Sequence, residues 1–173
     1  MGMQTDILSG HLDVVGFIVP NGRVRVKGIT YQASGGGNGV VDVFDTTVAP
    51  ITASYGRSSD LVTVTKTGHG LSTGDRVGIS FANASSASAT NGNYTITKLT
   101  ADTFTITDIN SGTVTPGTAC YYVNSGARWL TSFATITGQT MAVNVLLPGE
   151  GLLASLGVYL NFTNTTFVTI FYG

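Results

Sequence analysis

The sequence is poor in charge, in cysteine and in glutamate. Charged residues make up 10% of the 173 residues, with 8 Lys and Arg against 9 Asp and Glu, and glutamate occurs once, at Glu150. A chain with so few charges has no extended basic surface that could bind a nucleic acid. With a single glutamate, it also shows no pair of carboxylates of the kind that glycosidases use. The lone Cys120 excludes an intrachain disulfide and a cysteine-based metal site. We therefore expect no catalytic residue, no cofactor, no metal and no nucleic-acid partner.

Long hydrophobic runs are also missing. The longest, Leu152–Leu160, is interrupted by Ser155 and Gly157, and it is far shorter than the ~20 residues that a membrane-spanning helix needs. Residues Met1–Val14 have neither the basic nor the apolar region of a secretory signal. These observations predict that the chain has no membrane partner.

The residues that are present favour β-strands. Apolar residues make up 42% of the chain, and Thr, Val, Ile, Tyr and Phe dominate over helix formers. Many segments alternate with period two, and Gly, Asn, Ser and Asp turns separate them. We expect an all-β fold: an antiparallel, jelly-roll-like β-sandwich with an inserted small β-barrel or β-module. The expected strands include Arg23–Lys27 (with a bulge at Gly28), Val40–Asp45, Val62–Val64, Val77–Phe81, Tyr94–Ile96, Phe104–Ile106, Trp129–Ile136, Met141–Leu147, Val158–Phe162 and Phe167–Tyr172.

A shift in composition divides the chain. The middle is denser in Thr, and linker-like stretches flank it: Ala49-Pro50 with Ser54–Ser59 before it, and Asn124–Gly126 after it. We expect residues 1–59 and 124–173 to form one discontinuous β-sandwich that serves as an anchor domain. Residues 60–123 would be a small β-module inserted at a loop, where insertions are best tolerated.

The middle piece resembles a known module. It combines a His-Gly-Leu turn in Thr67–Asp75, an Asn-Gly-Asn-Tyr strand in Asn91–Ile96 and a Thr-Phe-Thr strand in Thr103–Ile106. Modules of this kind recur in virion proteins of tailed phages, and they are similar to a non-catalytic β-domain of ubiquitin-activating enzymes. The resemblance implies a structural or interaction module without ubiquitin chemistry.

The flanking pieces resemble small virion proteins of marine and freshwater phages. The residues concerned are Gly22–Gly28, Leu146–Gly151 and the ending Val168–Gly173. The resemblance implies a strand-rich structural protein of a phage particle.

Two histidines are the candidates for acid–base chemistry. His69 lies close to Ser72 and Asp75, but all three belong to one turn, so we expect His69 to stabilise that turn. His11 stands beside Asp13 near the N-terminus, where an exposed or partner-facing position is expected.

Arg23, Arg25 and Lys27 form the main charge feature, a ridge of three cations on one face of a strand. One interpretation is a solvated outer face, and another is a docking ridge for an acidic partner. Asp42 and Asp45 on a neighbouring strand are a third possibility, because they would neutralise the ridge within the fold.

The leading hypothesis is a capsid decoration or cement protein, non-enzymatic and located on the capsid exterior. Its partners would be the major capsid protein and further copies of itself, in a homotrimer matched to a threefold junction. Residues Met1–Gly10 would be an arm that pairs with a neighbour's sheet edge, while the aromatic residues Phe162, Phe167, Phe171 and Tyr172 would complete the core or form a subunit contact. The alternative is a tail or fibre appendage that binds host glycans through Trp129, exposed tyrosines and the Asn/Ser-rich loop at 82–93.

Overall fold

The computed structural model describes residues 7–82, 87–135, 140 and 142–173. Over these residues every regular element is a β-strand, which confirms the all-β prediction. In the same part of the chain there is no helix long and apolar enough to cross a membrane. The chain divides into two compact units, one made of residues up to Ala49 with Leu130–Gly173 and the other of Pro50–Trp129.

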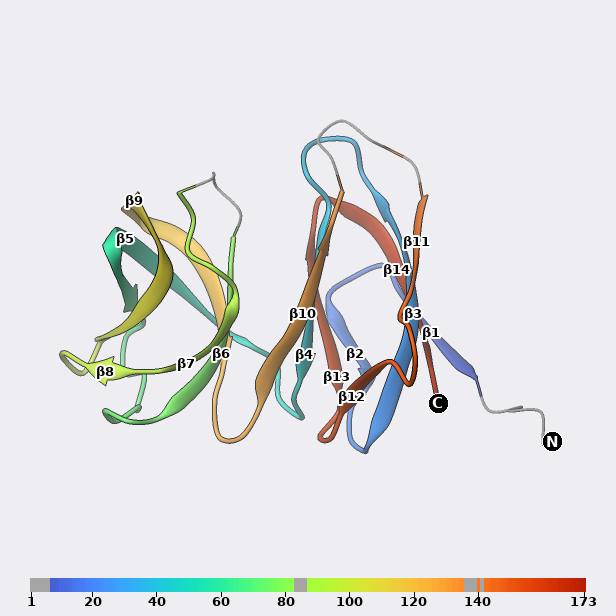
Figure 1. Ribbon diagram of the computed structural model, residues 1–173, viewed down its shortest axis with the longest axis horizontal. Helices are drawn as coiled ribbons and strands as arrows, with labels where there is room; N and C mark the ends of the chain where they lie inside the picture. Colours follow the sequence, from blue (N-terminus) through green and yellow to red (C-terminus); the bar gives the residue numbers. More distant parts are fainter. Residues whose placement is uncertain (1–6, 83–86, 136–139, 141) are drawn as a thin grey trace. The chain divides into compact units, whose positions relative to one another are not determined.

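The first unit, called the sandwich unit here, contains two antiparallel sheets. Figure 1 shows them stacked face to face, which confirms the predicted β-sandwich. One sheet has the order β1 (Leu8–Leu12), β14 (Thr165–Tyr172), β3 (Val24–Ala33) and β11 (Ala142–Leu146), with β12 (Leu152–Ala154) also paired to β3. The other has the order β10 (Arg128–Ala134), β4 (Val40–Asp45), β13 (Val158–Thr163) and β2 (Gly16–Val19).

The core of the sandwich unit follows the period-two pattern of its strands. The phase changes within β3, where Phe171 pairs with Gly28 and the next residue, Tyr172, pairs with Val26. Lys27 is therefore the extra residue of a β-bulge, as predicted at Gly28, and the bulge keeps both halves of β3 facing the core. The buried apolar residues of this core are Val26, Ile29, Tyr31, Val41, Val43, Ala154, Val158, Leu160, Phe162, Val168 and Ile170.

The second unit, called the inserted unit here, is one five-stranded sheet around its own core. Across the described residues this sheet is open, so the predicted module is not a closed barrel. Its strands are β5 (Ile51–Thr65), β9 (Thr103–Val123), β6 (Arg76–Phe81) and β7 (Gly92–Thr95), with β8 (Thr97–Lys98) paired to β9. The largest fully buried side chains of this core are Tyr55, Tyr122, Phe104, Ile79 and Ile96.

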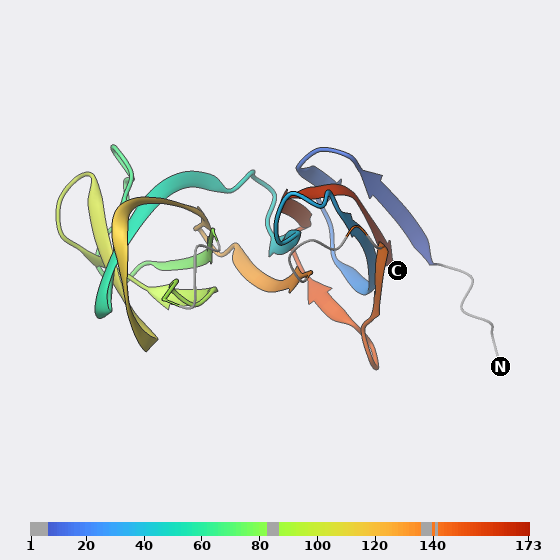
Figure 2. The same cartoon turned by 90° about the horizontal axis from the view of Figure 1, so that it is seen from above.

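Two long, bent strands, β5 and β9, organise the inserted unit (Figure 2). They pair from Ile51 opposite Tyr122 to Thr65 opposite Thr103, with register shifts between Tyr55 and Arg57 and between Ser59 and Leu61. The prediction that Ser54–Ser59 is a linker was therefore wrong, because bulges interrupted the alternation of a continuous strand. The paired strands β5 and β9 belong entirely to the inserted unit. The chain therefore passes from one unit to the other at Ala49/Pro50 and at Trp129/Leu130. The composition of the sequence had predicted these boundaries at 59/60 and 123/124.

The start of the described chain is a strand of the sandwich unit itself. Leu8 pairs with Tyr172 and Gly10 with Ile170, so β1 lies at the edge of the sheet beside β14. The expectation of an arm over Met1–Gly10 is corrected for these residues, because their backbone hydrogen bonds are made within the chain. The preceding residues, 1–6, lie outside the described part.

Asp45, at the end of β4, fixes the connection between β12 and β13. Its side chain is buried, and Oδ1 accepts hydrogen bonds from the backbone N–H groups of Ser155 (3.0 Å), Leu156 (2.7 Å) and Gly157 (3.3 Å). One carboxylate thus satisfies three consecutive backbone donors of this connection, including that of the buried Gly157.

Replacing Asp45 by Ala should lower the free energy of unfolding by ~1–3 kcal/mol, because buried N–H groups lose their acceptor. Urea unfolding followed by circular dichroism measures this change. Asp60→Ala removes an exposed carboxylate from β5 and is the matched control; equal effects of the two substitutions would contradict the proposed role of Asp45.

Candidate interaction surface

One side of the sheet β1–β14–β3–β11 faces away from the core, and we call it the outer face. Its members alternate with the core residues Val168, Ile170, Ile29 and Tyr31 along the paired strands. Arg25 and Lys27 lie on the same side of β3 before the bulge, at the edge of this face. The described members beyond the bulge include no Asp, Glu, Lys or Arg. They are Ser9 and His11 on β1, Phe167, Thr169 and Phe171 on β14, Gly28, Thr30 and Gln32 on β3, and Ala142, Asn144 and Leu146 on β11.

A polar row crosses the middle of the outer face. It consists of His11, Thr169, Thr30 and Asn144, one residue from each strand and each opposite the next. His11 Nδ1 lies 2.8 Å from the Thr169 hydroxyl, and the Thr30 hydroxyl donates to the Asn144 side-chain oxygen. On its other side, His11 Nε2 lies 2.9 Å from Asp13 Oδ1. The row is therefore held in place by its own hydrogen bonds.

Apolar groups flank this polar row. Phe171 and Leu146 lie on either side of Gly28, and a Cβ placed on that glycine would lie 3.7 Å and 3.4 Å from their side chains. Leu146 is 85% exposed. Beyond the polar row, the ring centroids of His11 and Phe167 are 5.4 Å apart. Aromatic and aliphatic groups around neutral polar ones are typical of the buried centre of a protein interface.

Two cations of the predicted basic ridge contact Glu150 within the chain. Arg25 forms an ion pair with Glu150 at 2.8 Å, and the Lys27 ammonium donates to the Glu150 carbonyl oxygen at 3.1 Å. Arg23 is exposed and precedes the first residue of β3. Glu150 therefore contacts two of the three cations, Arg25 through its carboxylate and Lys27 through its backbone carbonyl.

The idea that Asp42 and Asp45 neutralise the ridge was wrong. Both lie on β4, in the other sheet, and both are buried. Asp42 accepts a hydrogen bond from the Ser132 hydroxyl, and Asp45 holds the β12–β13 connection. Only the strand order shows which strands lie next to β3.

His69 stabilises its turn, as expected. Its Nδ1 accepts a hydrogen bond from Leu71 N–H (3.0 Å), so Nε2 carries the hydrogen and donates it to the Thr100 carbonyl (3.1 Å). The ring is buried and packs edge-on against Phe104. Asp75 is engaged in the same turn, where Oδ2 accepts Ser72 N–H at 2.8 Å. Both ring nitrogens are used structurally, and none is left to act as a base.

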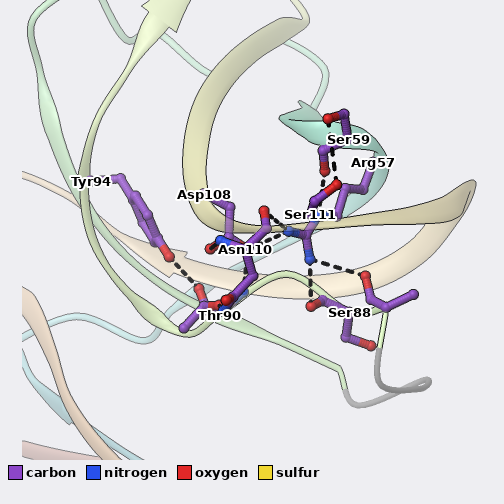
Figure 3. Close-up of polar contacts among 9 residues, drawn as sticks. Arg57, Ser59, Ser88, Thr90, Tyr94, Asp108, Asn110 and Ser111 are labelled. Atoms are coloured by element: carbon purple, nitrogen blue, oxygen red, sulfur yellow. Dashed lines mark hydrogen bonds and ion pairs between the residues drawn. The ribbon is translucent and has the colours of Figure 1, made fainter.

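Sequence reasoning missed a buried ion pair in the inserted unit, between Arg57 on β5 and Asp108 on β9 (Figure 3). Arg57 Nη2 lies 3.3 Å from Asp108 Oδ2, and neither side chain is exposed. A guanidinium has five N–H donors; the other contacts of Arg57 are with the backbone carbonyls of Ser59, Ala87, Ser88 and Asn110. The guanidinium is thus saturated by the chain and serves as a clamp between strands.

The surroundings of this pair shift two pKa values. Burial alone would raise the pKa of Asp108, but hydrogen bonds from Thr90 and Asn110, together with the Arg57 charge, lower it below its ordinary 3.8. Burial and then the Asp108 charge raise the pKa of Tyr94 to about 12, although Arg57 opposes the shift. The Tyr94 hydroxyl therefore stays protonated and donates to the Thr90 carbonyl.

The remaining candidate groups are the thiol of Cys120 and clusters of metal-ligating side chains. Cys120 is fully buried, and burial raises the pKa of its thiol to about 12, so it behaves as a small apolar residue. Among the described residues no group of three or more His, Cys, Asp or Glu is placed to hold a metal ion.

Comparison with known proteins places the chain in no family. No protein-family model matches it, and no curated protein matches it. A solved structure described as "Phage phi92 endosialidase" is similar over 81% of this chain and 20% of that chain, with 17% sequence identity and a TM-score of 0.32. The present chain thus spans about a fifth of the length of that protein, and a TM-score this low does not show a shared fold.

Replacing Asp108 by Asn should lower the free energy of unfolding at neutral pH by ~3–5 kcal/mol, because Arg57 keeps a buried charge without its partner. The lowered pKa means that ionised Asp108 contributes stability above about pH 3.8 and that this contribution is lost as the pH falls through the folded-state pKa. The difference between the two proteins should therefore shrink in acid.

Chemical denaturation at neutral pH and again well below pH 3.8 tests this, with Asp60→Asn as the exposed control. A difference that is unchanged in acid would show that the charge of Asp108 does not matter.

Proposed function

We propose that this chain is a non-enzymatic structural protein of a tailed-phage particle, and specifically a capsid decoration protein. It binds the major capsid protein through the outer face of the sandwich unit. The observation that carries this proposal is the composition of that face beyond the bulge of β3: aromatic, aliphatic and neutral polar groups lie in register on four strands, with no carboxylate, ammonium or guanidinium among the described members there.

The chemistry of the outer face fits a stable protein contact. Leu146 is almost fully exposed, and Phe167 and Phe171 are half-buried, so each exposes apolar area that a partner can cover. The polar row between them fixes the orientation of the partner, because its hydroxyl and amide groups require complementary hydrogen bonds. Low overall charge also suits a protein that functions inside an assembly.

The basic end of β3 would lie at the rim of the contact. Arg23, Arg25 and Lys27 supply three positive charges, and among the described side chains the carboxylate of Glu150 faces them, so this end suits an acidic patch on the partner. A rim charge of this kind affects mainly the rate of association. A homotrimer on the capsid exterior matches a threefold junction between capsid subunits.

The assignment to phage particles rests on the sequence resemblance of both pieces of the chain. The His-Gly-Leu turn at the centre of that resemblance is built by His69, Leu71 and Asp75 in the inserted unit. The alternative, a tail or fibre appendage that adheres to host glycans, shares this resemblance and differs in copy number.

Quantitative mass spectrometry of purified particles, relative to the major capsid protein, tests the location. A decoration protein should be present in hundreds of copies and in a simple ratio to capsid subunits. A few dozen copies or fewer would place the protein on the tail, and its absence from particles would overturn both assignments.

Replacing Leu146 by Glu should weaken binding to particles that lack this protein by at least about tenfold, because a charge is then buried at the contact. Leu99→Glu is the matched control, since Leu99 is exposed in the inserted unit, outside the outer face. Sedimentation of the purified protein with such particles measures the change. Equal binding by the two variants would show that the outer face is not the docking surface.

A further inference from the structure

The inserted unit contains a pocket that the proposed docking role does not use. Its volume is about 350 Å³, within the range of small-molecule sites. Two of the chain's eight cationic side chains line it. The lining residues are Arg76, Val77, Asn93, Gly126, Ala127 and Arg128.

Gly78 allows the two sides of this pocket, β6 and the backbone at Arg128, to pack closely against each other. A Cβ on Gly78 would lie 2.2 Å from Trp129 N and 2.7 Å from the Arg128 carbonyl carbon. Both distances are too short for a Cβ atom, so this packing requires glycine. The backbone at Arg128 therefore packs directly on β6, two residues from Arg76. This packing brings two arginines, far apart in the sequence, to one pocket.

Asn93 holds the same segment from the neighbouring strand. It pairs with Gly78 across β6 and β7. Its Nδ2 donates to the Trp129 carbonyl (2.9 Å), and its Oδ1 accepts Trp129 N–H (3.0 Å). The side-chain amide thus replaces a strand partner and fixes the backbone on which Arg128 is carried.

A tight turn completes the wall of the pocket. Ser125 and Gly126 both have positive φ, 56° and 86°, and Ala127 N–H donates to the Asn124 carbonyl at 3.1 Å. This is the geometry of a two-residue turn with left-handed central residues. The turn is held by its own backbone, so the pocket keeps its shape before a ligand arrives.

The charge of the pocket is positive. None of its described lining residues is acidic. The nearest carboxylate in the sequence, Asp75, lines an adjoining pocket of about 480 Å³ that shares Arg76 and Gly126. Asp75 carries one negative charge against the two positive charges of Arg76 and Arg128, so the lining residues of the two pockets together keep a net positive charge.

We propose that this pocket binds the carboxylate of an acidic saccharide, such as a hexuronic acid unit of a polysaccharide. Arg76 and Arg128 hold the carboxylate, because guanidinium groups match its geometry and charge. Ala127, which is half-buried, presents a small apolar surface to the C–H groups of the sugar ring. The adjoining pocket, with Asn124 and Ser125, offers polar groups to the hydroxyls of the next sugar unit.

The inference does not rest on the proposed capsid role. The pocket belongs to the inserted unit, whereas the outer face belongs to the sandwich unit. Loss of saccharide binding would leave the copy number in particles unchanged, and the two proposals can fail separately.

Nuclear magnetic resonance titration of the ¹⁵N-labelled full chain with a digalacturonate disaccharide tests the proposal. Saturable shifts are expected at Arg76, Gly126, Ala127 and Arg128. Arg76→Gln and Arg128→Gln should each weaken binding by about tenfold, because each removes one charge-assisted partner of the carboxylate. Lys98→Gln removes an exposed cation from β8 in the same unit and should leave the affinity unchanged.

A neutral disaccharide of the same size is the ligand control and should produce no saturable shift. Gly78→Ala keeps every charge but displaces the Arg128 backbone, so it should weaken binding while the spectrum stays dispersed. Equal binding of the neutral sugar, or the same affinity in all of the arginine and lysine variants, would overturn the proposal.

Discussion

Strand β3 is the constraint on which the sandwich unit depends. It pairs with β14 on one side and with both β11 and β12 on the other, so its register sets the register of the whole sheet. The bulge at Lys27 lets β3 change phase without turning its apolar side chains to solvent. This register aligns one polar residue from each strand in a single row across the outer face: His11, Thr169, Thr30 and Asn144.

Buried polar groups in both units support the fold. Asp45 satisfies three backbone donors at a strand connection, and Arg57 satisfies four carbonyls and one carboxylate. His69 bridges a turn to a neighbouring loop. With their donors and acceptors used internally, these residues stiffen loops and turns that lack regular strand pairing.

The two units present surfaces of different chemistry. The outer face combines apolar groups with neutral polar ones, as expected of a contact with another folded protein. The arginine-lined pocket is small and positive, as expected of a site for an acidic group on a small ligand. A structural protein that is anchored by one unit could therefore carry a separate binding activity in the other.

Alternation of apolar and polar residues was enough to predict the all-β class, most strand positions and the bulge near Gly28, because side chains of a strand point to opposite faces in turn. Local spacing also predicted that His69 would stabilise a turn. Strand β1 was not predicted as part of the sandwich, because Leu8–Leu12 contains Ser, Gly and His, which are weak strand formers. β5 was divided because its bulges break the alternation.

Only the tertiary structure decided which strands lie side by side. Pairing with β14 and β11 placed His11 and Asn144 in one row, and the strand order placed Glu150, not Asp42 or Asp45, beside the cations of β3. The pocket forms because Gly78 and Asn93 contact the backbone of Arg128 and Trp129, which lie far away in the sequence. Strand alternation is a local property that a sequence displays directly, whereas pairing and register join residues far apart in the chain and depend on how the whole core packs.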